Sequence, residues 1–486
     1  MTTAGSRIAS QFSSLLLLAL ATVGLLSPLH AQEEDTPSPS PTDAQAAATP
    51  EPTPPPASDE SVADRKQEQV VAEGRRRAKE EATSESAKPE DVDLTPAPDQ
   101  RALPGNDNAA PATGHEQSST QRRLRYQIGL TLRTVYDDNI NISKFDRQSD
   151  LYTTIEPTIN VGFGDPDNNF LALTYSPSAF IFISHSENDT LQHIISLAGQ
   201  YRFPQITVNL SEEIQILDGT GLNSATGTGT DFTRTNLDVS GRTRLNVYST
   251  RVDANYSLTG KTFLTADLSY SLSDYSTLLS SSVISGNVYA NYIYSPKLSI
   301  GLGATGGYDT SESRNDNQTF EQINVRASYE LTGKVSASIS AGFEFRQTEG
   351  GGSDNGSPVF DGTILYQPFD GTSVSLLLSR RTENSATLAG QDFHSTQATL
   401  SIRQRLLQRF FVGLSIGYEN STYFTTGAGF DSNRSDDYFF AQGSIDFNIT
   451  NFWTAGVFYF YRESSSSFDL FSFYDNQIGF RTSFTF

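Results

Sequence analysis

Hydrophobic and polar residues alternate along most of the chain after residue 124. One run is apolar at every second position: Phe410, Val412, Leu414, Ile416 and Tyr418. A period of two places such side chains on one face of a β-strand. The same pattern recurs over 124–132, 155–163, 284–294, 335–345, 453–461 and 478–486. No stretch beyond residue 124 approaches the roughly 18 consecutive apolar residues of a transmembrane helix, so we predict an all-β structure.

The positions between the apolar ones are mostly small, polar or charged. Next to Val335 they are Ser336, Ser338, Ser340, Gly342, Glu344 and Arg346, whereas Phe411 is an exception in its run. A soluble β-sandwich also alternates in this way, so alternation alone does not identify the kind of sheet.

Connections between the alternating runs are short and long in turn. The short ones fall at 203–205, 258–261, 295–297, 331–334 and 448–451. The long ones are polar and fall at 218–231, 310–319, 349–357, 425–436 and 463–468. Short periplasmic turns and long extracellular loops are typical of outer-membrane barrels, whereas a sandwich gives no reason for this asymmetry.

Aromatic residues lie close to the short connections. They are Tyr201, Phe203, Tyr256, Tyr294, Tyr329 and Tyr366. This placement favours an aromatic girdle at a membrane interface, although cross-strand aromatic pairing is the alternative explanation.

The last residues alternate until the chain stops at a phenylalanine. This ending resembles the terminal β-signal of bacterial outer-membrane proteins, which the barrel-assembly machinery reads. We therefore expect Phe480, Phe484 and Phe486 to form an assembly signal.

Dividing the chain at these connections predicts a transmembrane antiparallel up-and-down β-barrel over 124–486. It would have about 18 strands, at roughly 20 residues for each strand with its connection. The run over 232–258 alternates for longer than one span, so it is either a strand projecting beyond the membrane or contains a hairpin near 247–250. Sixteen strands is the alternative count. At 16 to 18 strands a barrel encloses an aqueous lumen.

Two further segments precede the predicted barrel. Residues 1–31 combine Arg7, an apolar run over 15–26 and a cleavage site before Gln32, which predicts a secretory signal peptide; an N-terminal membrane anchor is the alternative. Residues 32–123 hold 13 of the 21 prolines, with 19 acidic and 10 basic side chains. Such a segment buries too little apolar surface to fold, so we predict a disordered periplasmic linker with a transient helix over 61–88.

Composition excludes several classes of function. The chain has a net charge of −22 and no cysteine, but 31 Phe and 21 Tyr. The missing cysteines exclude disulfides and thiolate metal sites. The acidic balance argues against nucleic acid as a partner. We expect no cofactor and no bound metal.

One segment and two turns resemble a known family. Residues 134–140 contain Tyr136-Asp137-Asp138-Asn139 at the end of the first strand, which resembles the start of members of the beta-barrel porin 2 family. The turns at 256–261 and 329–334 are similar to the Tyr-x-Leu-[Ser/Thr]-x-Lys turns of that family. The resemblance covers 125–486 and implies an outer-membrane barrel. Some members accompany exopolysaccharide systems, so it implies location and architecture more than a substrate.

Charged residues on the polar phase of the strands are the candidate functional set. A charge facing lipid at the midplane costs about 2–4 kcal/mol, so we expect these side chains to face the lumen. Mixed signs could tune ion selectivity, or paired charges could fill a closed lumen. The candidates are Arg133, Arg326, Arg346, Arg403, Arg405, Arg462, Arg481, Glu330, Glu344, Asp267 and Asp446.

Signals for catalysis or metal binding are weak. Ser184, His185 and Asp189 have the residue types of an acyl-transfer site, but neighbours on a strand alternate faces and do not converge. Oxygen ligands at 137–139 and 165–168 are of the kind that Ca²⁺ prefers, although the second segment is more simply a turn.

These observations lead to three hypotheses. The first, which we favour, is a porin-like barrel that passes small polar solutes or saccharides and is not an enzyme. The second is a structural or accessory protein of polysaccharide export or envelope organisation. The third is an outer-membrane hydrolase, motivated by the segment around His185. In each case we expect an outer-membrane location, with contacts to lipid, lipopolysaccharide and the barrel-assembly machinery.

Overall fold

The computed structural model describes residues 124–166, 168–219, 241–312, 317–331, 333–349, 354–426 and 434–486. The predicted signal peptide, linker and transient helix lie outside these residues, as does the start of the 232–258 run. Across the described ranges, no helix has the length and apolar character needed to cross a membrane.

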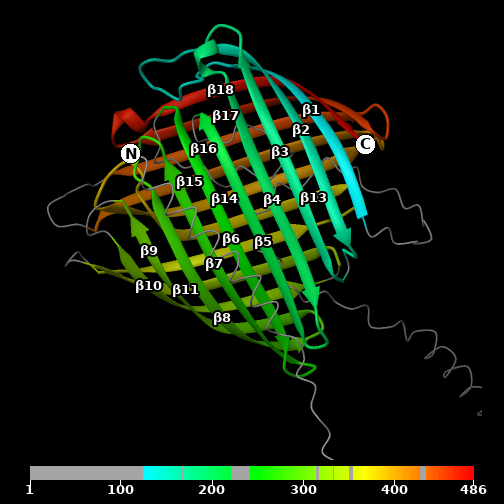
Figure 1. Cartoon of the computed structure of the whole chain (residues 1–486), viewed down its shortest axis with the longest axis vertical. Helices are drawn as coiled ribbons and strands as arrows, with labels where there is room; N and C mark the ends of the chain where they lie inside the picture. The colour runs from blue at the N-terminus through cyan, green and yellow to red at the C-terminus, as the bar shows by residue number, and fades with distance from the viewer. Residues whose placement is uncertain are drawn as a thin grey trace, which may run out of the picture. The chain divides into compact units, whose positions relative to one another are not determined.

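The described residues form 18 antiparallel strands in one sheet that closes on itself (Figure 1). Each strand pairs with its neighbours in the chain, and β1 closes the ring by pairing with β18. The prediction of an all-β, 18-stranded up-and-down barrel is confirmed, and the alternative of 16 strands is wrong. The strands are β1 (Leu124–Asp137), β2 (Asp150–Gly164), β3 (Phe170–Phe182), β4 (Thr190–Arg202), β5 (Ile206–Gly219), β6 (Thr243–Ser257), β7 (Thr262–Tyr275), β8 (Ser281–Ser295), β9 (Leu298–Ser311), β10 (Gln318–Glu330), β11 (Val335–Thr348), β12 (Asn355–Tyr366), β13 (Thr372–Asn384), β14 (Gln391–Leu406), β15 (Phe410–Thr425), β16 (Ser435–Asn448), β17 (Trp453–Ser466) and β18 (Phe473–Thr485).

The long alternating run contains one strand rather than a hairpin. β6 pairs without interruption with β5, from Thr243 to Tyr256, and with β7, from Leu245 to Ser257. The hairpin considered near 247–250 is therefore wrong. Residues 232–240 of the run lie outside the described residues.

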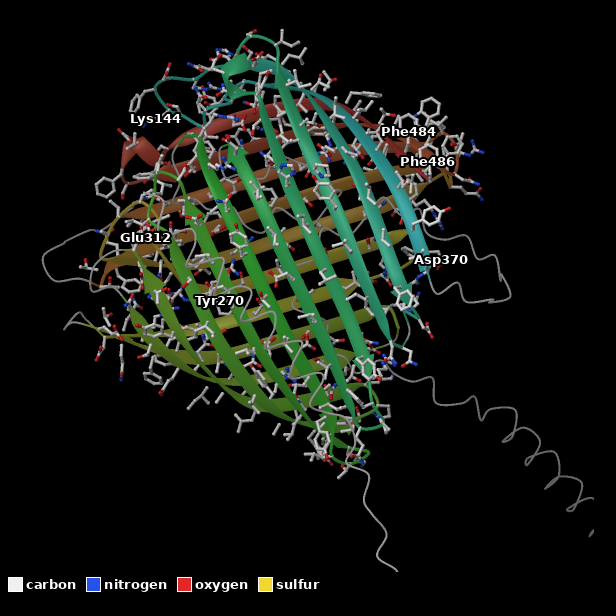
Figure 2. The ribbon with its side chains drawn as sticks, in the orientation of Figure 1. Lys144, Tyr270, Glu312, Asp370, Phe484 and Phe486 are labelled. Atoms are coloured by element: carbon white, nitrogen blue, oxygen red, sulfur yellow. The ribbon has the colours of Figure 1, made fainter. Side chains whose placement is uncertain are left out.

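Short and long connections lie at opposite ends of the barrel. Connections after even-numbered strands run from two residues (296–297) to five (367–371), whereas those after odd-numbered strands run from five (276–280) to 23 (220–242). In Figure 2, Lys144 and Glu312 of two long loops lie at one end, and Asp370 and Phe486 lie at the other. Two 3₁₀ turns, η1 (Ser186–Asn188) and η3 (Asp469–Phe471), lie in long loops. We call the two ends the short-turn end and the long-loop end.

Burial follows the period of two along each strand. On β17, Phe458 and Phe460 are 4% and 1% exposed, whereas Val457 and Tyr459 between and beside them are 52% and 47% exposed. The exposed phase is apolar on most strands, which is the surface a transmembrane barrel presents to lipid. Five tyrosines of the expected girdle are exposed near the short-turn end: Tyr201, Tyr256, Tyr294, Tyr329 and Tyr366.

Candidate functional site: a narrowed lumen at the long-loop end

The β13–β14 hairpin separates from the wall of the barrel in the half that lies toward the long-loop end. β12 and β13 pair only between Tyr366↔Val374 and Phe360↔Arg380, although both strands continue beyond this last pair. β13 and β14 stay paired with each other as far as Asn384↔Asp392. Pro358, which has no backbone N–H to donate, lies two residues beyond the last β12–β13 pair.

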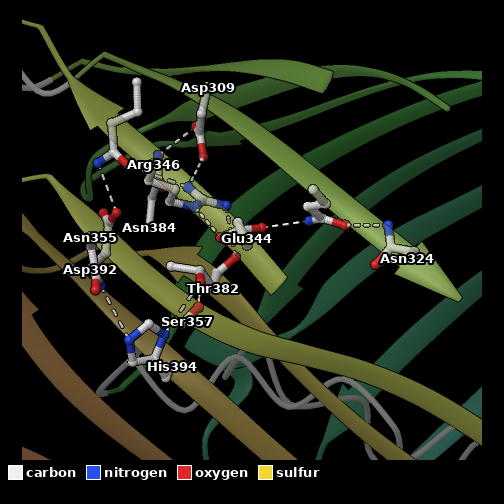
Figure 3. A network of polar contacts seen from close by, with 12 residues as sticks. Asp309, Asn324, Glu344, Arg346, Asn355, Ser357, Thr382, Asn384, Asp392 and His394 are labelled. Carbon is white, nitrogen blue, oxygen red and sulfur yellow. Dashed lines mark hydrogen bonds and ion pairs between the residues drawn. The ribbon is translucent and has the colours of Figure 1, made fainter. Parts of the chain in front are cut away.

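The separated half of the hairpin leans into the lumen. Thr382, Asn384, Asp392 and His394 share the phase of Leu378 and Leu400, which are exposed outside the barrel. They contact the inner phase of β9–β12 instead of pointing outward (Figure 3). The Asn384 Nδ2 donates to Asp309 Oδ1 at 2.7 Å, and Gln318 Nε2 donates to Asp392 Oδ2 at 2.8 Å. The outer face of the hairpin is therefore packed on the inner face of the wall.

Arg346 is the centre of this polar contact. Its side chain is 7% exposed, and its Nε donates to Glu344 Oε1 at 2.6 Å. One terminal nitrogen donates to Asp309 Oδ2 at 3.2 Å, and the other donates to the backbone carbonyl of Thr382 on the hairpin at 3.3 Å. The guanidinium also lies over the ring of Phe320, 4.9 Å from its centroid. Arg346 therefore joins three wall strands to the hairpin.

The tip of the hairpin reaches the wall at β6 and β7. The backbone N–H of Leu279, in the loop after β7, donates to the carbonyl of Ala386 at 2.8 Å. Ala386 is buried in a small apolar cluster with Leu245 of β6 and Tyr275 of β7. Five strands, β8–β12, separate β7 from β13 along the wall. The hairpin thus bridges the lumen at the long-loop end.

A second element narrows the lumen from the other side. In the loop after β1, Ile140 and Ile142 are 2% and 1% exposed. They belong to an apolar cluster with inward side chains of β1–β3 and β16–β18: Val135, Tyr152, Phe180, Phe182, Tyr438, Phe440, Phe458, Phe460 and Phe473. We call this group the aromatic cluster. The loop over 138–149 therefore folds inward rather than away from the barrel.

Polar contacts fix the position of this loop. Asn139 is fully buried, and its Nδ2 donates to the carbonyl of Tyr474 on β18 at 2.8 Å. Both the backbone and the side-chain nitrogen of Asn476 donate to the Asp138 carboxylate, at 2.8 and 2.9 Å. At the same long-loop end, the guanidinium of Arg242 lies over the ring of Phe182, and burial lowers the pKa of this guanidinium.

Most of the charged residues singled out in the sequence lie in ion pairs between strands. Arg133 pairs with Glu156 at 2.8 Å, and Arg481 Nε donates to Asp446 Oδ1 at 2.8 Å. Asp267 pairs with Arg251, and Arg462 pairs with Asp475. Together with Arg346 and Glu344, they lie in the inner phase of their strands. Their effect on ion selectivity stays a prediction.

The other candidates are placed differently. Arg326 donates to Asn291 Oδ1 at 2.8 Å and lies over the ring of Tyr289. Arg403 lies over the ring of Phe411, so the aromatic exception in the polar phase contacts an arginine. Arg405 lies beside Gly371 in the turn after β12, and Glu330 is exposed at the short-turn end of β10. These four side chains do not join the polar contacts of the hairpin.

Several residues at the narrowing were not singled out from the sequence. Asp309, Gln318, Asn384 and Asp392 hold the hairpin, and Arg434 is fully buried beside Asp436, with its guanidinium 3.4 Å from the centroid of the Phe471 ring. The local pattern gives no signal for them, because the partners of Asn384 and Asp392 lie more than 70 residues away. The inward aromatic residues could be anticipated in part, because Phe411 already stands among the polar positions of its strand in the sequence.

The residues of the weak catalytic signal do not converge, and two of the three acidic residues that meet near Asp137 are engaged in ion pairs. His185 Nδ1 lies 3.1 Å from Asp150 Oδ2, whereas Asp189 accepts the backbone N–H of Phe182. Carboxylate oxygens of Asp137, Asp138 and Asp475 come within 4.8 Å of one another. However, Asp475 is paired with Arg462, and Asp138 with Arg147. In the second oxygen-rich segment, the Asn168 N–H donates to the Asp165 carbonyl as a turn requires, and Asp167 lies outside the described residues.

Comparisons with known proteins give structural likeness without sequence relatedness. No family model and no curated protein matches the chain. Among solved structures it is similar to Acinetobacter baumannii OccAB4, with 8% identity over 76% of this chain and 100% of that chain, and a TM-score of 0.39. It is also similar to Pseudomonas aeruginosa OccK2 in complex with glucuronate, with 8% identity over 74% and 98%, and a TM-score of 0.41. Pseudomonas aeruginosa OpdK with vanillate matches with 10% identity over 74% and 98%, and a TM-score of 0.39. The fold itself follows from the strand pairing described above.

Proposed function

We propose that this chain is an outer-membrane, porin-like β-barrel that lets small polar solutes or saccharides pass. An 18-stranded barrel is wide enough to enclose an aqueous lumen. The observation that carries the proposal is the β13–β14 hairpin, whose outer face is turned inward and held by a polar network. A barrel with a purely structural role has no need of such an element, whereas a pore uses one to restrict what passes.

Conductance of the purified protein in planar bilayers tests this function. The folded protein should give discrete conductance steps and should let small saccharides swell liposomes. The double variant Gln318→Ala with Asn384→Ala removes two hydrogen bonds that hold the hairpin, so its steps should be larger. The control is Tyr418→Phe, which removes a hydrogen bond to Asp437 on the outer face and should leave the steps unchanged. A folded barrel that neither conducts nor swells liposomes contradicts the proposal.

The location and the assembly partners belong to the same proposal. The outward phase suits lipid and lipopolysaccharide, and the chain would be exported through the segment 1–31. Phe480 on the outside of β18 is 50% exposed, Phe486 directly after β18 is 70% exposed, and Phe484 stacks on Trp453. We propose that these three residues are presented to the barrel-assembly machinery. Deletion of Phe486 should lower the amount of barrel recovered in outer membranes, and an unchanged amount would exclude this role.

The two alternatives have less support among the described residues. The accessory role in polysaccharide export depends on the linker 32–123, which lies outside them. The hydrolase requires Ser184, His185 and Asp189 to converge, whereas the His185 ring contacts the carboxylate of Asp150 and Asp189 accepts the backbone N–H of Phe182. An unchanged lipid or peptide hydrolysis by His185→Ala would exclude that residue as a catalytic group.

A further inference from the structure

One acidic residue lies at mid-height on the outer face of the barrel. Glu212 is the seventh of the 14 residues of β5. It stands opposite Leu197 of β4, which shares the phase of Leu191 and Tyr201, and these two side chains are 55% and 49% exposed outside the barrel. In a membrane-spanning barrel, this position faces the centre of the bilayer. An ionisable side chain there is costly and marks a functional site.

Other acidic residues in the outward phase avoid this position. On the described strands they all lie within three residues of a long-loop end: Asp218, Asp274, Glu321, Asp392, Asp437 and Glu463. Glu212 is thus an exception to a pattern that the rest of the wall follows.

Polar groups continue from Glu212 onto the next two strands. Thr250 of β6 is its register partner and donates to Glu212 Oε2 at 2.5 Å. Tyr270 of β7 is the register partner of Thr250, and Figure 2 shows it between the two ends of the wall. We call Glu212, Thr250 and Tyr270 the polar row.

A second polar contact lies on the two strands beyond β5. The hydroxyl of Tyr175 on β3 is 2.9 Å from His193 Nδ1 on β4, and the two rings are parallel to within 6°. Both residues are in the outward phase. The mid-height outward face of β15 is apolar by contrast, with Leu414, Ile416 and Tyr418 exposed.

From this arrangement we infer that the outer face of β3–β7 docks a second copy of this chain within the membrane. The inference rests on the proposed membrane location. A partner covering the polar row would remove Glu212 from lipid and supply it with further hydrogen bonds, which lipid chains cannot do.

The composition of the face favours a second copy over a different protein. A two-fold interface brings the same surface together from both partners, so that surface must complement itself. The polar row carries a carboxylate that accepts hydrogen bonds and two hydroxyls that donate them, and the Tyr175–His193 contact adds further polar groups to the same face. Copies related by a two-fold axis along the membrane normal keep the same orientation, so each row meets its counterpart at the same depth.

Single-cysteine cross-linking in native outer membranes tests the interface. The chain has no cysteine of its own, so any disulfide comes from the introduced residue. Val252→Cys places a thiol on the outer face of β6, two residues from Thr250, and leaves the polar row intact. The matched control is Ile416→Cys, which is outward and at mid-height on β15. On oxidation, Val252→Cys should shift to a band of twice the mass, and Ile416→Cys should stay monomeric.

Glu212→Leu supplies a second measurement that does not depend on cross-linking. It should shift the protein in mild detergent from dimer to monomer while the conductance of each barrel stays unchanged. Equal cross-linking of the two cysteine variants, cross-linking of Val252→Cys only to other proteins, or an unchanged mass for Glu212→Leu would each overturn the inference. A protein absent from the membrane fraction would instead contradict the proposed function.

Discussion

The lumen is narrowed from two sides by different kinds of contact. On the side of β9–β14, hydrogen bonds and an ion-pair network around Arg346 hold the hairpin against the wall. On the side formed by β16–β18 and β1–β3, Ile140 and Ile142 pack into the aromatic cluster. Hydrogen bonds are directional and specify one geometry, whereas apolar burial depends mainly on the area removed from water. We infer that the hairpin sets the shape of the opening from one side and that the loop narrows it from the other.

Of the changes that probe this comparison, removing Arg346 should lower the free energy of unfolding most. Arg346→Ala leaves Glu344 and Asp309 buried without their cation, and breaking a buried pair costs about 3–5 kcal/mol. The free energy of unfolding in detergent should fall by that amount, measured by the fluorescence of Trp453, the one tryptophan of the chain. Arg251→Ala is the control, because the Arg251 side chain is 33% exposed in its pair with Asp267. Equal losses in the two variants would show that the network is not specially buried.

Truncating a side chain of the aromatic cluster should cause the next largest loss of unfolding free energy. Ile142→Ala removes a buried side chain from the aromatic cluster and should lower the free energy of unfolding by about 2–5 kcal/mol. Leu407→Ala is a close control, since Leu407 has φ of 49° and Ile142 has φ of 46°, but Leu407 is 86% exposed. Urea unfolding should separate the two variants. Similar midpoints would mean that the loop is not anchored by burial.

An exposed ion pair on the same loop should have the smallest effect. Lys144 pairs with Asp469 at 2.5 Å, but their side chains are 42% and 69% exposed. Exposed pairs contribute less than about 1 kcal/mol, so Lys144→Ala should barely change the unfolding midpoint. Any difference should vanish at high salt, where surface charges are screened. A loss as large as that of Ile142→Ala would show that charge, not burial, holds the loop.

The strand pattern could be predicted from the sequence because it is local. The alternation within a run such as Val335–Phe345 predicts a strand without reference to other residues. Short turns such as 203–205 indicate where strands end. The count of 18 follows from these local signals. The boundaries of long loops were less accurate: β5 continues to Gly219, beyond the expected start of its loop at Asp218.

The narrowing could not be predicted because it depends on contacts across the barrel. On β17, Val457, Phe458, Tyr459 and Phe460 are all apolar, so no phase identifies the inward aromatics. The hairpin leans inward because β12 and β13 stop pairing beyond Phe360 and Arg380. Pro358 is the one local sign of that separation. The pairing of Arg481 with Asp446 joins residues 35 positions apart, on strands that are not neighbours.

The seam between β1 and β18 has a consequence for how the protein is made. The backbone N–H of Phe486 donates to the carbonyl of Ile128 at 2.8 Å, and the N–H of Ile128 donates back at 3.0 Å. The ring cannot close until β18 has been synthesised, because β18 follows every other described strand in the chain and is the strand that pairs with β1. Until then each end strand keeps a row of unsatisfied amides, which is a template for aggregation. We therefore expect a product that lacks β18 to aggregate or to be degraded rather than to accumulate as a folded barrel.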